Sequence, residues 1–240
     1  MSLQRSVPAS IAVLAVTLAS CSDSSRLSSR CLAGEVASCT QLGDMYAAGL
    51  GVERDLGRAA EMYERACSGG AADVCNTLGE IYERTGAIEG GPERAFVMFQ
   101  RACEGGSLAG CLNWGLAFAD REDWTRAVAL YEKSCTGGWA ACCHQLAQSF
   151  ERGEGVKADA SRALALYGQA CDAEFVDGCV AAGTIYLAGS LVPRDLPSAQ
   201  LFYARAIKVL DESCQAGIDR DCTERDRLRT RVALAAADRD

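Results

Sequence analysis

Large apolar, small and aromatic side chains recur at fixed offsets along the chain. Counted from Cys39, they stand at Leu42, Gly43 and Tyr46, which are three, four and seven residues away. Side chains at these offsets share one face of an α-helix, and the small member lets a neighbouring helix approach closely. The pattern predicts one such helix at each recurrence: Leu42-Gly43-Tyr46, Leu78-Gly79-Tyr82, Trp114-Gly115-Phe118, Leu146-Ala147-Phe150 and Ala182-Gly183-Tyr186.

A second helical pattern follows each of the first ones. Alanine, an aromatic residue and cysteine stand four residues apart, as in Ala59-Tyr63-Cys67, Ala95-Phe99-Cys103, Ala127-Tyr131-Cys135 and Ala163-Tyr167-Cys171. Glycine-rich segments such as 49–52 and 153–156 separate the two helices of a pair. A turn such as 68–70 stops the second helix. This alternation predicts antiparallel helix pairs that repeat along the chain.

The cysteines give this repeat its register. Twelve of the fourteen form pairs with seven residues between the members, and the first members step forward by 36, 36, 32, 36 and 43 residues. Such periods are typical of repeat arrays. Continuous helix would hold paired Cα atoms about 12 Å apart, whereas a disulfide needs them within about 7 Å, so the turn between them must fold the chain back. We predict the disulfides Cys31–Cys39, Cys67–Cys75, Cys103–Cys111, Cys135–Cys143, Cys171–Cys179 and Cys214–Cys222.

Zinc binding is the alternative use of paired cysteines. Zinc ligands usually stand two to four residues apart in closed sets of four, and because that spacing is missing here we predict no metal site. Cys142 is left over from the pairing. It is either a buried free thiol or a reactive one that exchanges with Cys135 or cross-links two molecules.

The N-terminus has the features of an export signal. Arg5 precedes an apolar segment, 11–18, that is too short to span a bilayer. The following Leu18-Ala19-Ser20-Cys21 resembles the lipobox of bacterial lipoproteins. This resemblance implies a signal peptide over 1–20 and an acylated Cys21 as the only membrane contact. By resemblance to the sorting rules of bacterial lipoproteins, Ser22 favours the outer membrane, facing the periplasm. An ordinary secretory signal would instead give a soluble periplasmic or secreted protein. Residues 21–30, polar and serine-rich, predict a flexible tether.

The whole unit, Ala-x3-Tyr-x3-Cys-x2-Gly-x4-Cys-x2-Leu-Gly-x2-Tyr, resembles the Sel1-like repeat, and more closely its cysteine-rich bacterial subfamily. The resemblance covers residues 31–222 and implies an all-α, right-handed α-solenoid of antiparallel helix-turn-helix repeats, akin to tetratricopeptide arrays. The last repeat departs from it, because Ile207 stands where cysteine is expected and Cys214 follows seven residues later. Two further helical turns would keep the same face. Residues 223–240 are predicted to form a capping helix and tail.

Charge and missing motifs argue against several classes of function. A net charge of −8 argues against a nucleic-acid partner. The sequence shows no phosphate-binding loop, no zinc-protease motif and no triad signature around its only histidine, His144, so we predict no cofactor and no catalytic residue. The resemblance leaves one alternative, since some cysteine-rich members are described as penicillin-binding proteins with slow β-lactamase activity. The Ser-x-x-Lys motif of serine β-lactamases does not occur in this sequence.

The resemblance instead implies a monomeric scaffold that binds a protein or peptide partner in a concave groove lined by the first helices. Transferring the tetratricopeptide groove positions gives, just after each second cysteine, Thr40, Asn76, Leu112, His144 and Val180, and four residues further on Asp44, Glu80, Leu116, Gln148 and Thr184. These residues predict a groove that is partly acidic toward the N-terminal repeats and aliphatic in its middle. Such a groove suits an extended peptide or a protein loop that has a basic part and an aliphatic anchor.

Overall fold

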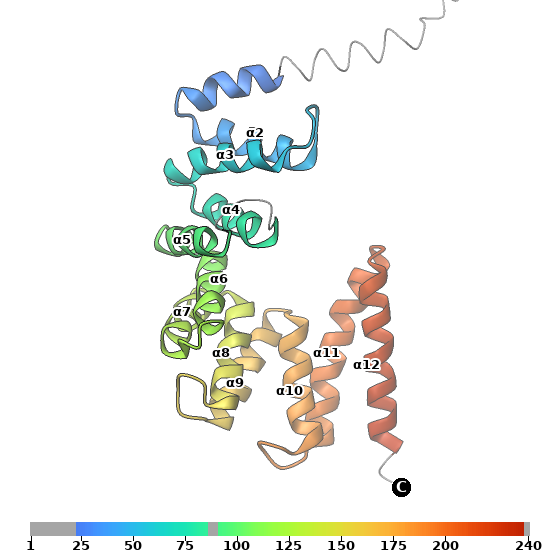
Figure 1. Cartoon of the computed structure of the whole chain (residues 1–240). Coiled ribbons are helices and arrows are strands. Elements are labelled where there is room, and N and C mark those ends of the chain that lie inside the picture. Colours follow the sequence, from blue (N-terminus) through green and yellow to red (C-terminus); the bar gives the residue numbers. More distant parts are fainter. Residues whose placement is uncertain (1–22, 86–90, 238–240) are drawn as a thin grey trace, which may run out of the picture. The chain divides into compact units, whose positions relative to one another are not determined.

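The computed structural model describes residues 23–85 and 91–237, and every regular element within them is an α-helix (Figure 1). The helices alternate between a first and a second type. The first helices are α2 (Val36–Ala48), α4 (Ala72–Thr85), α6 (Leu108–Ala119), α8 (Ala140–Arg152), α10 (Val176–Ala188) and α12 (Asp219–Ala237). The second helices are α3 (Leu56–Ser68), α5 (Gly91–Glu104), α7 (Trp124–Thr136), α9 (Ala160–Asp172) and α11 (Leu196–Gln215). The predicted all-α solenoid of helix pairs is confirmed.

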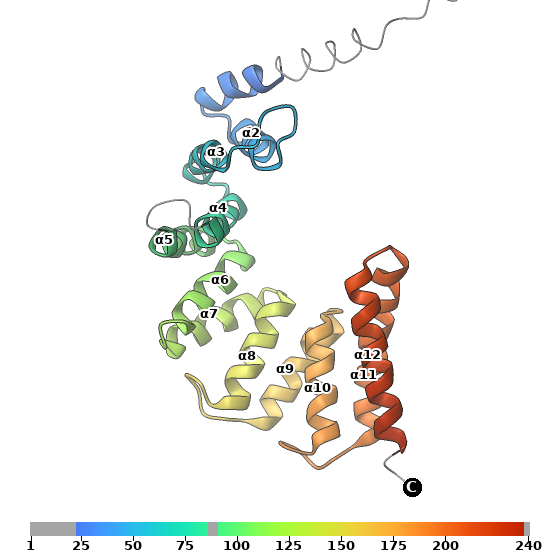
Figure 2. The same cartoon turned by 45° about the vertical axis from the view of Figure 1, so that its right-hand side comes forward.

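The chain divides into two compact units, Met1–Asn113 and Trp114–Asp240. In the first unit α2 packs on α3 and α4 packs on α5. In the second unit α8 packs on α9, α10 packs on α11, and α11 packs in turn on α12. Figures 1 and 2 show α10, α11 and α12 side by side from two directions.

Disulfides join the end of each second helix to the start of the next first helix. The six bonds connect the predicted pairs, Cys31–Cys39, Cys67–Cys75, Cys103–Cys111, Cys135–Cys143, Cys171–Cys179 and Cys214–Cys222. The turn inside each pair needs one residue with positive φ, and glycine supplies it in five of the turns, as at Gly70 (φ 95°). Glu174 (φ 60°) takes that position between Cys171 and Cys179.

In four of the first helices, the recurrent glycine lies against an aromatic ring of the partner helix. A Cβ atom built on Gly79 would lie 2.4 Å from Cε1 of Phe99, and one on Gly43 would lie 2.5 Å from Cε1 of Tyr63. Gly115 with Tyr131 and Gly183 with Tyr203 repeat the contact. These glycines are therefore required by the close approach of the two helices, as their recurrence in the sequence indicates.

An aspartate and an arginine fix the start of the second helices, a feature that the sequence analysis missed. The Asp55 carboxylate caps α3 by accepting from the backbone N–H of Arg58, and Asp123 and Asp159 cap α7 and α9 in the same way. The Arg58 guanidinium lies over the ring of Tyr46, 5.6 Å from its centroid. The repeated Asp-x-x-Arg sequence is the signal that identifies this link between the two helices of a pair.

The prediction of a flexible tether over 21–30 was wrong from residue 23 onwards. Residues 23–32 form a helix, and Leu27 is only 7% exposed. Leu27 precedes Cys31 by the four residues that separate Tyr63 from Cys67, so this segment takes the position of a second helix before α2. Cys21 and the predicted signal peptide lie outside the described residues.

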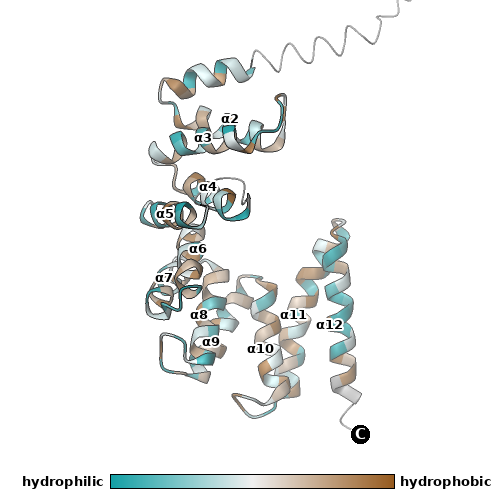
Figure 3. Ribbon diagram, viewed as in Figure 1, coloured by the Kyte–Doolittle hydropathy of each residue, from teal (hydrophilic) through white to brown (hydrophobic). Residues whose placement is uncertain are grey.

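The helices at the C-terminal end are those predicted, but the last one begins earlier than predicted. The extended helix expected between Ile207 and Cys214 is confirmed, because α11 runs without interruption from Leu196 to Gln215. The last helix begins at Asp219, before the boundary predicted at residue 223. Figure 3 shows that α12 is largely hydrophilic, and Leu228 is its buried anchor in the core formed with α11. A polar outer helix of this kind protects the end of a repeat array from water.

Candidate partner-binding site

The ten predicted groove residues lie on five first helices. Asn76 is buried, Asp44 is exposed and the others are half-buried. They are Thr40 and Asp44 on α2, Asn76 and Glu80 on α4, Leu112 and Leu116 on α6, His144 and Gln148 on α8, and Val180 and Thr184 on α10. Whether they contact a partner stays a prediction, but the structure shows which of them have partners inside the chain.

Two of these residues bind tyrosines of the second helices. The Tyr63 hydroxyl donates to the Asp44 carboxylate over 2.7 Å, and the hydroxyls of Thr184 and Tyr203 lie 3.1 Å apart. Burial of the ring, and then the bond to Asp44, raise the pKa of Tyr63 above its ordinary value. The phenol therefore stays protonated and keeps donating at physiological pH. Asp44 thus contributes to helix packing as well as to the surface.

Asn76 and Glu80 form a polar network with Asn113, which the sequence analysis did not identify. The Asn76 side-chain amide donates to Glu80 Oε1 over 2.9 Å. The Asn113 amide donates to Asn76 Oδ1 over 2.9 Å and to Glu80 Oε1 over 3.3 Å. Because Asn76 is only 7% exposed, these bonds satisfy groups that would otherwise be buried without partners. They tie α6 to α4 within the first unit.

An open pocket lies beside this network in the first unit. It has a volume of about 410 Å³ and is lined by Ala47, Arg54, Leu56, Tyr63, Thr77, Glu80, Ile81 and Arg84. Arg54 donates from Nε to the Ala47 carbonyl oxygen over 3.1 Å. Arg54 and Arg84 are exposed, whereas the Glu80 carboxylate accepts from two amides. The positive groups are therefore the ones most open to a ligand.

The predicted ligand with a basic part stays a prediction. The carboxylates on which it rests, Asp44 and Glu80, also accept hydrogen bonds within the chain, and Asp44 is exposed. The pocket presents two guanidinium groups beside the aliphatic side chains of Leu56 and Ile81. Such a surface favours an acidic segment with an aliphatic side chain.

The second unit presents a different surface. The His144 ring lies between those of Tyr167 and Phe175, with centroid distances of 5.2 and 5.6 Å. Burial lowers its pKa, so the ring is neutral at physiological pH, and its buried Nδ1 has no hydrogen-bond partner among the described residues. Arg231 of α12 reaches the Thr184 hydroxyl of α10 over 3.5 Å. His144 thus packs as an aromatic side chain.

Cys142 is a free thiol in the interior of the second unit. It is 0% exposed, and burial raises its pKa to about 11, while a hydrogen bond with Ser134 acts in the opposite direction. The thiolate is the form that attacks disulfides and reagents. The geometry therefore favours the buried-thiol interpretation over exchange with Cys135 or cross-linking of two molecules.

We expect native protein and a Cys142→Ala variant to give equal thiol counts with Ellman's reagent at about pH 8. After unfolding in guanidinium, wild-type protein should show one additional thiol per chain, because only unfolding exposes Cys142. Rapid labelling of that extra thiol in the native state would contradict the buried position.

Residues 23–85 and 91–237 contain neither a candidate metal site nor a candidate membrane span. Among these residues no group of three or more His, Cys, Asp or Glu side chains is arranged to hold a metal ion. None of their helices has the length and apolar character required to cross a bilayer.

Comparison with known proteins identifies the repeat. A family model described as the Sel1 repeat matches residues 36–70, 73–107, 108–139, 140–175 and 176–208. Each matched segment of the first unit begins at or near the start of a first helix and extends past its second helix. None of the curated proteins compared with this chain matched it.

Solved structures share the fold. A protective antigen of uropathogenic Escherichia coli strains, which displays an SLR fold, superimposes with a TM-score of 0.68 at 19% identity and covers 87% of this chain and 48% of its own, so this chain spans about half of that protein's length. A Sel1 repeat protein from Oxalobacter formigenes gives 0.67 at 22% identity, covering 73% and 74%. The immunity protein Pa5087 from Pseudomonas aeruginosa gives 0.52 at 14% identity, covering 78% and 73%.

Proposed function

The chain belongs to the Sel1 repeat family, whose members are generally protein-interaction scaffolds, and we propose that it binds a protein or peptide partner on the surface of its first helices. The observation that supports this proposal is the pocket beside α4, where Arg54 and Arg84 stand next to Leu56 and Ile81. Arginines beside apolar side chains are typical of the residues that dominate binding energy at interfaces. The partner segment would present a carboxylate next to an aliphatic side chain.

The experiment is capture of the partner by the whole chain from envelope extract, followed by measurement of its affinity for the wild type and two variants. Arg84→Glu should weaken binding about 10-fold or more, because it places like charges together. The matched control is Arg65→Glu, an exposed arginine of α3 outside this pocket. Both variants should keep the wild-type helical circular-dichroism signal and melting temperature, since exposed charges contribute about 0–1 kcal/mol each.

Equal affinity for wild type and Arg84→Glu, with loss in Arg65→Glu, would place the binding surface elsewhere. Reversing Asp44 and Glu80 is a poorer test, because it would also remove the hydrogen bonds to Tyr63, Asn76 and Asn113. Saturable hydrolysis of nitrocefin by the purified chain would contradict the scaffold proposal and favour the β-lactamase alternative.

We further propose that the protein is exported and lipid-anchored through Cys21, in the outer membrane facing the periplasm. Six disulfides support export, because such bonds form and persist in oxidising compartments. Cys21→Ala should release the protein from the membrane fraction without lowering its melting temperature, since Cys21 precedes the disulfide-bonded array. Fractionation followed by immunoblotting checks this result. Continued membrane association of the variant would indicate another anchor.

A further inference from the structure

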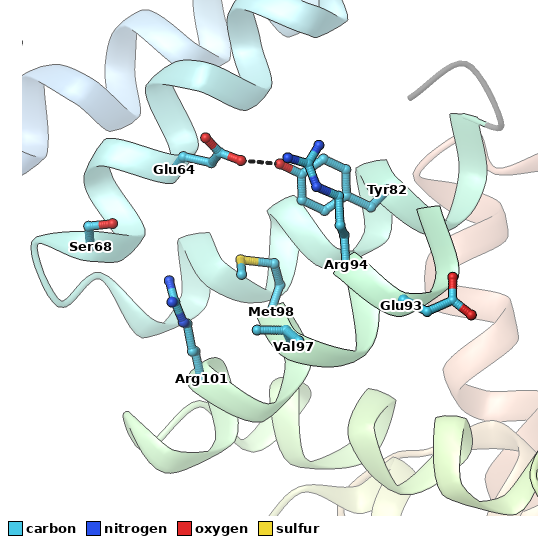
Figure 4. A pocket seen from close by; sticks show the side chains of 8 residues that line it. All are labelled: Glu64, Ser68, Tyr82, Glu93, Arg94, Val97, Met98 and Arg101. Carbon is cyan, nitrogen blue, oxygen red and sulfur yellow. Dashed lines mark hydrogen bonds between the residues drawn. The ribbon is translucent and has the colours of Figure 1, made fainter. Parts of the chain in front are cut away.

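A second pocket lies between the second helices α3 and α5 in the first unit, away from the surface used in the proposed function. It has a volume of about 480 Å³ and is lined by Glu64, Ser68, Tyr82, Glu93, Arg94, Val97, Met98 and Arg101 (Figure 4). Val97 is 43% exposed, so its side chain is accessible from the pocket. Figure 4 shows Val97 and Met98 at the middle of the pocket, with Arg101 opposite Ser68 at one end.

The other end of the pocket is occupied by interactions within the chain. The Tyr82 hydroxyl donates to the Glu64 carboxylate, and burial together with that bond raises the pKa of Tyr82 to about 12. The Arg94 guanidinium lies over the Tyr82 ring, 5.1 Å from its centroid. These contacts fix Glu64, Tyr82 and Arg94 in place, and Figure 4 shows the exposed Glu93 side chain pointing away from Val97 and Met98. Arg101 and Ser68 are therefore the polar groups open to an acidic ligand beside Val97.

The corresponding position in the second unit shows what Arg101 lacks. Arg205 stands two residues after Tyr203, as Arg101 does after Phe99. Arg205 binds the carboxylate of Asp172 over 2.6 Å, and Asp172 directly follows Cys171. In the first unit, the residue directly after Cys67 is Ser68.

Arg101 therefore has the position of an ion-pairing arginine without the acidic partner. Within residues 23–85 and 91–237, no carboxylate oxygen lies within 4.0 Å of its guanidinium. Ser68 adds a hydroxyl donor on the opposite side of the opening. A carboxylate supplied by a ligand would restore the pair that Asp172 makes with Arg205, and it would leave the exposed Val97 side chain beside it available for an apolar contact.

We propose that this pocket is a second docking site, which binds a segment of a partner protein that carries an acidic side chain next to an aliphatic one. The acidic side chain binds Arg101 and Ser68, as Asp172 binds Arg205. The aliphatic side chain covers Val97 and Met98. The scaffold thus has one binding surface on its first helices and another between α3 and α5.

The test uses the whole chain with its disulfides intact and the peptide Ac-Ser-Gly-Asp-Leu-Gly-Ser-NH2, whose termini are blocked. Nuclear magnetic resonance titration should shift the Arg101 Nε–H and Val97 methyl signals as the peptide binds. Replacing Asp by Asn in the peptide should weaken binding about 10-fold or more, since the carboxylate–guanidinium pair is lost. Arg101→Gln should weaken the Asp peptide by a similar factor, whereas Arg65→Gln, the corresponding arginine of α3, should leave its affinity unchanged.

Ser68→Asp provides an independent control that leaves Arg101 in place. The new carboxylate should pair with Arg101, as Asp172 does with Arg205, and so block the site and weaken the peptide about 10-fold. Equal affinity of the Asp and Asn peptides, or no effect of either Arg101→Gln or Ser68→Asp, would overturn the proposal. A peptide with a free C-terminal carboxylate and no acidic side chain should bind more weakly than the Asp peptide. Tighter binding by that peptide would overturn the proposal that Arg101 binds an acidic side chain. Affinity for this pocket is read from the Arg101 Nε–H and Val97 methyl shifts, which Arg84→Glu should leave unchanged because Arg84 lines the other pocket. This readout separates the proposal from the proposed function, in which Arg84→Glu weakens binding.

Discussion

Replacing Phe99 by alanine is expected to lower the free energy of unfolding by about 3–5 kcal/mol, as truncation of buried aromatic side chains generally does. The ring is 1% exposed and lies against Gly79, where there is no Cβ atom to move into the space left behind. Shifts of two helices would be needed to close the cavity, and the disulfides at the ends of α5 and α4 restrain such shifts. Guanidinium unfolding followed by circular dichroism measures the change.

Leu201→Ala is the control for this measurement. Leu201 is 61% exposed on α11, so its truncation should change stability by less than about 0.5 kcal/mol. Leu42→Ala, at a buried position that the repeat pattern predicts, should lower the free energy of unfolding by about 2–5 kcal/mol. A loss in Phe99→Ala no larger than that in Leu201→Ala would mean that the helix pair closes around the missing ring.

The sequence was sufficient to predict the helix pairs and the disulfides, because the same residue pattern occurs in each repeat. Gly43, Gly79, Gly115 and Gly183 mark the close approach of two helices, and one chance coincidence does not disturb an inference drawn from several recurrences. The prediction for residues 23–30 was wrong because this segment carries too little of the repeated pattern. Leu27 is the single buried apolar residue of a serine-rich segment, and its burial comes from tertiary packing, which overrides the weak helix propensity of serine.

The candidate site was less predictable, because its properties depend on contacts between helices of different repeats. The register placed Asn76 and Glu80 on the correct helix, but Asn113, which binds both, lies 37 residues after Asn76. Arg54 reaches the pocket from a loop that has no helical register. Counting charges along the first helices therefore gave a partly acidic surface, whereas the pocket that Glu80 lines also exposes Arg54 and Arg84.

The paired positions of Arg101 and Arg205 show how a repeat helps where periodicity alone does not. The two arginines have the same register, but only one of the residues that face them, Asp172, is acidic. Such a difference becomes informative only after the structure shows that Arg205 and Asp172 form an ion pair. Equivalent positions then serve as internal controls for each other.

Reduction of the disulfides is expected to abolish the native helical array at 37 °C. Each bond closes a loop of eight residues, and the loss of chain entropy in the unfolded state gives about 2–3 kcal/mol of stabilisation for each bond. Native domains are stable by only about 5–15 kcal/mol in total, so loss of all six bonds removes a comparable amount even if the contributions do not add fully. Circular dichroism of reduced, alkylated protein should show a largely unfolded chain.

A single bond tests the same argument without disturbing the others. Cys103→Ala combined with Cys111→Ala should lower the free energy of unfolding by about 2–5 kcal/mol and leave the other five bonds recoverable by non-reducing peptide mapping. Cys142→Ala should be included in both backgrounds, because unfolding exposes that thiol and allows exchange with Cys135 or Cys143. If reduced protein kept its full helicity and melting temperature, helix packing alone would stabilise the array. The disulfides would then give much weaker support for export, since the fold would survive equally well in a reducing compartment.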